Sequence, residues 1–390
     1  MPLRQLFLGT LAKCTHSQWH MPNTFENGCR LMGNNQAILP SQTIREYIKK
    51  GHISTSTPIE ESQIQPASID LRLGSVAYEL RSSFLPGELS DIVTKLETLQ
   101  LCRRTLDLEN SAVLEANKVY LIELTESLSL PPHVWARANP RSTTGRADMF
   151  TRLLCDFGTE FEGVPPGYTG KLYVEVVPRT FSVRVKQGTR LNQIRFISET
   201  WPHGIDLLEP EGKQNLHSLR KQILTVDLEP GDSAGIIGFR ARRHAPVLDF
   251  DCVGCHDRQE FWDPLFLGEL RSIVLAPDDF FLLKSTESVV INPREAAELS
   301  PYDPSFGEFR VHYAGFLDPG FGYEAKASVD QGTPVVLEVR TRDVCFLIEH
   351  AQRIAWLQYY QLHDLPDKIY GAGIGSSYHR QGITPGKQFT

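Results

Sequence analysis

The chain has 390 residues, of which 41% are hydrophobic and 22% are charged, a composition typical of a globular protein. Its length exceeds that of one ordinary core and favours two domains. The net charge of −7 argues against a nucleic-acid polymer as the partner, because binding a polyanion usually requires a basic excess over a broad face. A small phosphorylated ligand needs only a local basic cluster.

No apolar run approaches the roughly 18 residues of a membrane span, and Leu6-Phe7-Leu8 is too short for the core of a signal peptide. The sequence therefore predicts no membrane partner and a cytoplasmic location. The cysteines are odd in number and scattered, which predicts reduced thiols. They are Cys14, Cys29, Cys102, Cys155, Cys252, Cys255 and Cys345.

Residues 1–36 show no periodicity and are interpreted as a flexible N-terminal extension. A helix is predicted from Ser41, its capping residue, with Ile44 and Tyr47 on one side and Gly51 as its end. Strand patterns follow, beginning with the alternating segment from Ile64 to Gly74 and continuing at 118–124, 171–177, 181–186 and 194–198. Helical periodicity is scarce elsewhere, so the predicted class is mainly β, with strands closing as a barrel or distorted jelly roll.

The sequence also repeats itself. Thr125-Glu126-Ser127 is matched by Thr286-Glu287-Ser288, and Val174-Glu175-Val176 by Leu337-Glu338-Val339 at almost the same separation. Two matched pairs of segments at nearly the same separation along the chain indicate a diverged tandem duplication. The predicted divisions are the extension at 1–36, module 1 at 37–220 and module 2 at 221–390.

The strongest chemical signal is the segment Arg141-Ser142-Thr143-Thr144-Gly145-Arg146. Two guanidinium groups bracket three hydroxyls and a glycine, which are the donors that a phosphate chain needs. A solvated basic loop is the alternative interpretation. In the second copy, Tyr302 and Asp303 occupy the positions of Arg141 and Ser142, so only module 1 keeps the anion-binding residues.

The strand pattern at 171–177 places Tyr173 and Glu175 on one face and Val174 on the other. A carboxylate between valines and beside an aromatic ring is partly desolvated, which suits a general base. A glutamate on a solvent-facing side of the strand is the alternative. Glu338 holds the same place in module 2.

Two metal or cofactor signals are weak. Cys252-Val253-Gly254-Cys255-His256 has the spacing of a covalent haem site or half a zinc site, but no second cysteine pair accompanies it. No histidine is followed two positions later by glutamate, so the zinc-deaminase signature is absent, and so is a phosphate-binding P-loop. The sequence therefore predicts no zinc.

Together these segments resemble the dCTP deaminases, relatives of the trimeric dUTPases, in a tandem form with two modules in one chain. The resemblance covers roughly residues 37–390. It is carried by the helix ending at Gly51, the strand from Ile64 to Gly74, the loop from Arg141 to Arg146, the turn Pro166-Gly167-Tyr168-Thr169-Gly170 that leads to Glu175, and the tail from Tyr370 to Gln381.

The resemblance implies two dUTPase-like β modules. It implies that the loop, with Ser142, Thr143, Thr144 and Gly145 between its arginines, binds the triphosphate. It further implies that Tyr173 and Val174 line the base pocket, that Glu175 is the catalytic general base and acid, and that the tail closes over the nucleotide through Tyr370, Tyr378 and Gln381. Mg²⁺ would be bound through the substrate triphosphate, in a homo-oligomer with threefold or pseudo-threefold symmetry.

Two positions depart from the family pattern. The aspartate expected before the Pro-Gly turn is Pro165 in module 1 but Asp318 in module 2, and a lysine usual in the tail is Ser377. Because the anion-binding loop lies in module 1 and the tail follows module 2, a complete site is expected to need both.

The predicted reaction is hydrolytic deamination of dCTP to dUTP and ammonia. A dUTPase, or a bifunctional deaminase and diphosphatase, is the first alternative. A non-catalytic nucleotide-binding module is the second.

Overall fold

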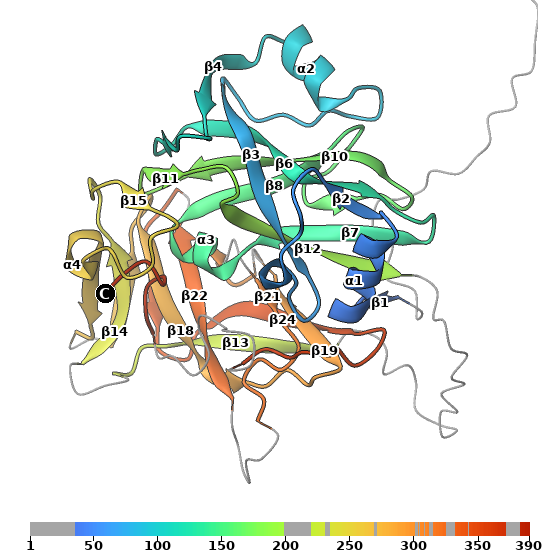
Figure 1. Ribbon diagram of the computed structural model, residues 1–390. Coiled ribbons are helices and arrows are strands. Elements are labelled where there is room, and N and C mark those ends of the chain that lie inside the picture. Colours follow the sequence, from blue (N-terminus) through green and yellow to red (C-terminus); the bar gives the residue numbers. More distant parts are fainter. Residues whose placement is uncertain are drawn as a thin grey trace, which may run out of the picture. The chain divides into compact units, whose positions relative to one another are not determined.

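The structure is a computed structural model that describes residues 36–198, 220–230, 235–268, 271–300, 303, 305–307, 309–311, 315–324, 332–341, 343–371 and 383–390. All of these residues belong to one compact unit. The expectations for the N-terminal extension up to residue 35, for Tyr378 and for Gln381 lie outside the described residues. The described residues are mainly β with a few short helices, as predicted (Figure 1).

The first module is built around one large sheet in the strand order β8-β10-β6-β3-β12-β7-β9. Outside this order, β1 pairs with β12, β2 with β6 and β4 with β3, and β5 joins a small separate sheet. Its elements are β1 Ala37–Ile38, α1 Ser41–Lys49, β2 Ile53–Thr55, the 3-10 helix η1 Glu61–Gln63, β3 Ile69–Leu80, α2 Ile92–Thr98, β4 Cys102–Asp107, β5 Ala112–Leu114, β6 Val119–Ser129, β7 Val134–Pro140, α3 Ser142–Arg146, β8 Met149–Cys155, β9 Gly163–Val164, β10 Thr169–Pro178, β11 Val183–Val185 and β12 Arg190–Ser198.

The second module contains a sheet in the order β16-β14-β18-β13-β24-β19-β21, with β22 beside β18 and β20 beside β22. Its elements are β13 Lys221–Asp227, β14 Ile236–Ala241, β15 Leu248–Asp249, α4 Arg258–Phe261, β16 Trp262–Phe266, β17 Ser272–Leu275, β18 Phe280–Val289, β19 Glu295–Leu299, β20 Phe309–Val311, β21 Phe316–Leu317, β22 Thr333–Thr341, β23 Phe346–Glu349 and β24 Arg353–Gln361.

The two sheets share a strand order, which confirms the predicted tandem form. In the first module the run is β8-β10-β6-β3-β12-β7-β9, and in the second it is β20-β22-β18-β13-β24-β19-β21. The repeated Thr-Glu-Ser segment has one structural role in both modules. Glu126 accepts a hydrogen bond of 2.8 Å from the backbone N–H of Arg72, and Glu287 accepts one of 2.8 Å from that of Thr225. Each glutamate thus fixes the backbone of its neighbouring strand.

The first sheet nearly closes on itself because its two end strands approach each other. The backbone N–H of Glu162, next to β9, donates to the carbonyl of Leu153 on β8 at 3.0 Å. Burial raises the pKa of the Glu162 carboxyl to about 8. The nearly closed sheet surrounds a core that includes Leu172, Val174 and Val176 of β10.

The modules pack through the outer face of β22 and β18. Val335, Leu337 and Val339 of β22 enter the second module's core, so the alternate residues of this strand face module 1. Val336 is one of these alternate residues, and it packs against a core cluster that contains residues of both modules. The outer face of β22 therefore lies against the segment that carries the candidate site.

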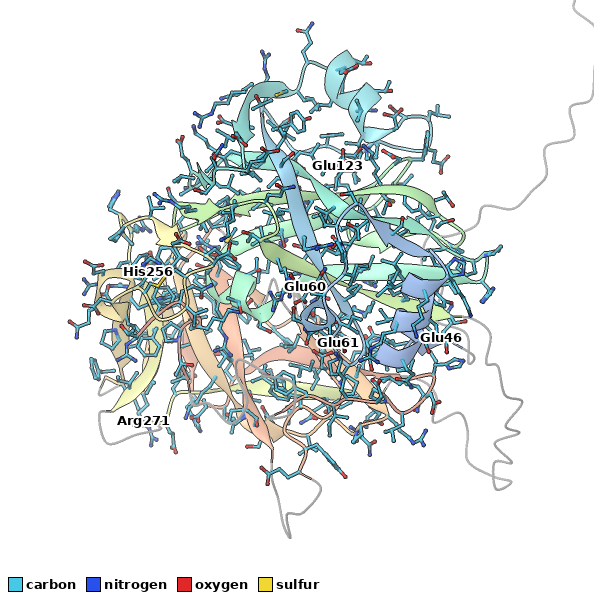
Figure 2. The ribbon with its side chains drawn as sticks, in the orientation of Figure 1. Glu46, Glu60, Glu61, Glu123, His256 and Arg271 are labelled. Carbon is cyan, nitrogen blue, oxygen red and sulfur yellow. A yellow bond between two sulfur atoms is a disulfide. The ribbon has the colours of Figure 1, made fainter. Side chains whose placement is uncertain are left out.

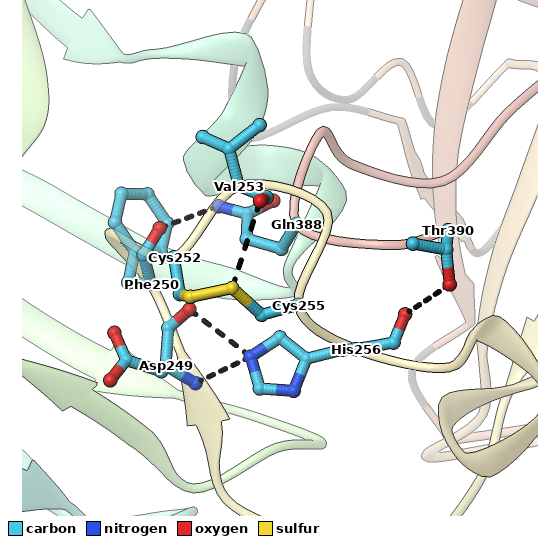
Figure 3. The surroundings of a disulfide bond; sticks show 8 residues. All are labelled: Asp249, Phe250, Cys252, Val253, Cys255, His256, Gln388 and Thr390. Atoms are coloured by element: carbon cyan, nitrogen blue, oxygen red, sulfur yellow. Dashed lines mark hydrogen bonds between the residues drawn. A yellow bond between two sulfur atoms is a disulfide. The ribbon is translucent and has the colours of Figure 1, made fainter.

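Three local expectations differ from the structure. Ser41 is the first residue of α1 and not its cap, because Pro40 precedes the helix and Ser41 donates its hydroxyl to Asp367. The strand predicted from Ile64 begins at Ile69. Cys252 and Cys255 are not reduced thiols but form a disulfide, since a turn brings their Cα atoms to 5.7 Å (Figure 3). Among the described helices, none is both long and apolar enough to cross a membrane.

Candidate active site

The segment Arg141 to Arg146 forms α3 and its approach, directly after β7. Its backbone is fixed to β12, where the carbonyl of Leu191 accepts from the Arg141 backbone N–H at 2.9 Å and from the Thr144 hydroxyl at 2.7 Å. Thr143, Thr144 and Arg146 are buried, and Ser142 is half-buried. The segment is therefore an ordered part of the protein interior, unlike the solvated loop of the alternative interpretation.

Arg141 is paired with a buried carboxylate of β3. Its Nε lies 3.2 Å from Oδ1 of Asp70, whose exposed fraction is only 1%. Burial raises the pKa of Asp70, and the positive charge of Arg141 opposes that rise. The ion pair orients one guanidinium of the loop while its half-buried side chain stays reachable from solvent.

The second module brings a glutamate to this loop. A Cβ built on Gly145 would lie 2.2 Å from Oε2 of Glu338, so the carboxylate occupies the space that any larger side chain would take. Glu338 is 3% exposed and lies on the face of β22 that meets module 1. The absence of a side chain at position 145 is what permits this approach.

A second contact locks the same two elements together. Arg340, two residues after Glu338 and on the same face of β22, forms an ion pair with Asp148, just after α3. Asp148 also accepts from the Thr180 hydroxyl at 2.6 Å. Burial raises the pKa of Asp148, and Arg340 counteracts that rise. This pairing fixes the position of β22 relative to the anion-binding loop.

Asp318, in the Pro-Gly turn of module 2, also reaches the site. It lies half-buried beside the backbone of Ala67 and within electrostatic range of Asp70 and Arg141. Burial, with the charge of Asp70 as the next cause, raises the pKa of Asp318 to about 7. Tyr370 adjoins the same turn, since its backbone N–H donates to the carbonyl of Pro319 at 2.7 Å.

The C-terminal residues complete one wall of the site. Nη1 of Arg146 donates to the carbonyl of Thr384 at 3.0 Å. Residues 383–390 therefore contact the anion-binding loop directly, although Tyr378 and Gln381, expected to close over the nucleotide, lie outside the described residues. Of the predicted tail residues, only Tyr370 can be placed.

Glu175 has a different environment. Arg152 of β8 donates to its Oε1 from Nε at 3.0 Å and from Nη2 at 2.5 Å. The Arg152 guanidinium lies 3.5 Å from the centroid of the Phe161 ring. No hydrogen bond or ion pair within the described part of the chain joins Glu175 to the loop at 141–146.

The neighbours of Glu175 on β10 belong to two separate clusters. Tyr173 packs with residues of α2 in an outer cluster, whereas Val174 points into the first core. Glu175 lies three residues before Pro178 on β10. Pro178 pairs with Met149, the first residue of β8, which follows the loop in the chain. That spacing separates Glu175 from the loop end of the strand by roughly 10 Å.

The structure thus brings together Arg141, Gly145 and Arg146 with two residues of module 2, Asp318 and Glu338. The catalytic role assigned to Glu175 and the base-pocket role assigned to its two neighbours stay predictions. The repeat itself was the signal for Glu338, since it matches Glu175 in the second copy. Asp70 and Asp148 were missed, because an aspartate in a strand or after a short helix carries no pattern of its own.

No group of three or more histidine, cysteine or acidic residues among the described residues is arranged to hold a metal ion. The donors at the loop are guanidinium, hydroxyl and backbone N–H groups, which bind phosphate oxygens and not cations.

Two family models match the chain. The model for the 2'-deoxycytidine 5'-triphosphate deaminase N-terminal domain matches residues 35–200, and that for the C-terminal domain of the same enzyme matches residues 206–389. The crystal structure of 2'-deoxycytidine 5'-triphosphate deaminase from Agrobacterium tumefaciens is 40% identical, with a TM-score of 0.76. The similarity covers 85% of this chain and 100% of that one.

Single-module relatives match about two fifths of the chain. A dUMP-forming dCTP deaminase of Methanobrevibacter smithii is 28% identical over 171 residues, which is 43% of this chain and 82% of the relative. A protein of the same description from Aquifex aeolicus is 31% identical over 161 residues, which is 41% of this chain and 80% of the relative.

Proposed function

The chain belongs to the dCTP deaminase family, and from this premise we propose that it hydrolyses the cytosine amino group of dCTP, giving dUTP and ammonia. The observation that carries the proposal is the meeting of Glu338 with Gly145. It sets a buried carboxylate directly against a loop whose two arginines and three hydroxyls suit a triphosphate.

We propose that Glu338 is the general base in this composite site. Its carboxylate takes a proton from a water molecule as the water oxygen bonds to C4 of cytosine. The same carboxyl then delivers protons to the departing amino group, so water adds, ammonia leaves and a carbonyl remains at C4. One positioned acid and base contributes on the order of 10²–10⁴-fold, and the remainder comes from orientation and from fixed polar groups around the intermediate.

Glu175 is the rival candidate, since the family resemblance assigns the base to its strand. Two observations favour Glu338. Glu338 meets the loop directly at Gly145, and the equivalent loop of module 2, which a base at Glu175 would need, has lost its arginine and serine. We therefore propose one reaction centre per chain, formed by α3 of the first module and β22 of the second.

The proposal includes further components of the site. Mg²⁺ enters with the substrate on its phosphates, and zinc takes no part. In this proposal Tyr370, next to the Asp318 turn, contacts the nucleotide, with Tyr378 and Gln381 as further tail contacts. A homo-oligomer with threefold symmetry remains part of the proposal, although the loop and Glu338 meet within a single chain.

A bifunctional reaction is the second candidate, since relatives from Methanobrevibacter smithii and Aquifex aeolicus are described as dUMP-forming. In that case water also attacks the α-phosphate and pyrophosphate leaves.

Product analysis separates the candidates. Purified protein is incubated with dCTP and Mg²⁺, and ammonia, pyrophosphate and the nucleotide products are quantified. Ammonia with dUTP supports the proposal, whereas equal amounts of ammonia, pyrophosphate and dUMP support the bifunctional candidate. Saturable binding of dCTP without any product contradicts both and favours the non-catalytic alternative.

A further inference from the structure

Asp148 is bonded to the glycine that Glu338 contacts. Its backbone N–H donates to the carbonyl of Gly145 at 2.9 Å, and its own carbonyl accepts from the backbone N–H of Arg179 at 2.9 Å. The side chain of Asp148 is fully buried. Its backbone is therefore held from both directions along the chain, and its carboxylate starts from a fixed place beside the loop.

Arg340 is held within module 2 before it reaches this carboxylate. It lies on β22, and its Nη1 donates to the backbone carbonyl of Asp278 at 2.7 Å. Only 11% of its side chain is exposed. One nitrogen of the guanidinium is thus bonded to module 2, and the second, Nη2, extends to module 1.

Nη2 of Arg340 binds two groups of module 1 that also bind each other. It donates to Oδ2 of Asp148 and, at 3.0 Å, to the hydroxyl of Thr180. That hydroxyl donates in turn to the same carboxylate oxygen at 2.6 Å. Separating a buried guanidinium from its carboxylate leaves an uncompensated charge, so this contact resists movement of one module against the other.

These contacts form a closed circuit with Glu338. Gly145 is bonded to Asp148, and Asp148 is bonded to Arg340. Glu338 precedes Arg340 by two residues on the same face of β22, roughly 7 Å away at the Cα atoms. The Glu338 carboxylate then lies against Gly145. A shift of β22 relative to α3 would have to break the ion pair.

The repeat provides an internal comparison. At the separations that relate the two copies, Asp148 corresponds to Phe309 and Arg340 to Val177. Neither of these equivalent residues is charged, so the opposite combination of strand and loop has no such pair. The ion pair thus accompanies the one combination in which the arginine-bearing loop meets a strand glutamate.

We propose that Arg340 and Asp148 are positioning residues, which set the place of the Glu338 carboxylate over α3 and thereby the rate of deamination, not the affinity for dCTP. The inference rests on the proposed function for the reaction. Asp148 is fully buried and Arg340 is bonded to three acceptors, so we assign neither a contact with the nucleotide. A displacement of about 1 Å at a reacting group lowers a rate by up to about 100-fold.

The test compares Arg340→Met, Asp148→Asn and the double variant with the wild type, by equilibrium binding of dCTP and by ammonia release in a single turnover. We expect each single variant to bind dCTP within about threefold of the wild type and to release ammonia at least about tenfold more slowly. Because the two residues act as one unit, the double variant should be no slower than the slower single variant.

Arg271→Met is the matched control and should behave as the wild type in both assays. Arg271 is 63% exposed, pairs with Glu229 within module 2 and is labelled in Figure 2 at the edge of the molecule. Melting curves check the fold of each variant. Arg340→Lys, which keeps the charge but loses the fork, is used if the Met variant does not fold.

Crystal structures of the wild type and Arg340→Met give a readout that does not depend on the reaction. We expect the Glu338 carboxylate to move by about 1 Å or more relative to Gly145. An unmoved carboxylate overturns the proposal, and so do equal losses of affinity and rate or additive losses in the double variant. A wild-type protein that binds dCTP but releases no ammonia contradicts the proposed function alone, because the structures still decide what the ion pair positions.

Discussion

The carboxylate of Glu338, in the second module, packs against the backbone of Gly145, in the first. The two residues belong to the two copies of a duplicated unit, and neither module alone supplies both. The site is therefore a product of the way the copies pack, with β22 of one copy laid against α3 of the other.

Replacing Gly145 with alanine tests this contact. The added methyl would lie 2.2 Å from Oε2 of Glu338, so either the carboxylate or the loop must move. A displacement of about 1 Å at a reacting group costs up to about 100-fold in rate, so we expect kcat/KM for dCTP to fall at least about tenfold. Gly268→Ala is the matched control, because nothing lies within 4 Å of a Cβ there. An active Gly145→Ala variant with unchanged kinetics would contradict the composite site.

A further ion pair between the modules joins a buried arginine to a half-buried glutamate. Arg195, 3% exposed, pairs with Glu298 at 2.5 Å and donates to Asn139 at 2.8 Å. Replacing Arg195 with methionine leaves the carboxylate without its partner, so we expect unfolding by urea to show a loss of about 3 kcal/mol. The exposed pair Arg271–Glu229 is the control, and Arg271→Met should change stability by less than about 0.5 kcal/mol. Equal effects of the two variants would show that the pair does not stabilise the fold.

Asp318 gives the protein a pH-dependent stability. Its pKa is about 7 in the folded protein and 3.8 without burial, so between these values the folded state keeps a proton that the unfolded state has lost. The contribution of Asp318 to the free energy of unfolding therefore decreases as pH rises from about 4 to 7 and is constant above that range. Asp318→Asn should flatten this part of the stability profile, measured by urea unfolding from pH 5 to 8. Parallel profiles for the variant and the wild type would refute the assignment.

Removing the disulfide should loosen residues 387–390, whose backbone is hydrogen-bonded to the turn between Cys252 and His256, without unfolding the protein. The bond closes a very short loop, so its contribution to stability through the unfolded chain is at most about 2 kcal/mol. In the double variant Cys252→Ser, Cys255→Ser we expect faster amide hydrogen exchange at residues 387–390 and a higher KM for dCTP. Strand β10 should exchange as in the wild type. Unchanged exchange at 387–390 would show that the hydrogen bonds of the turn suffice without the disulfide.

The sequence predicted the mainly β class and the duplication because both rest on local patterns. Alternation along β10 and β12 marks strands, and the repeated Thr-Glu-Ser segment has the same hydrogen-bonding role in each module. The loop at Arg141 was also visible, since its guanidinium and hydroxyl groups are contiguous.

The partner of that loop could not be predicted in the same way. Glu175 and Glu338 occupy equivalent places in their strands, and local pattern gives no means of choosing between them. The choice depends on which outer strand face meets α3, which is a property of module packing. The roles of Asp70 and Asp148 depend on contacts between distant segments, so no spacing in the sequence predicts them.

The most direct test of the account compares Glu338→Gln with Glu175→Gln. Each variant is assayed for dCTP binding and for ammonia release under single-turnover conditions. We predict that Glu338→Gln binds dCTP but releases ammonia at least about a hundredfold more slowly, while Glu175→Gln stays within about threefold of the wild type. The contradicting result is a Glu338→Gln protein that keeps a tenth of the activity, or a Glu175→Gln protein that binds dCTP and is the slower of the two.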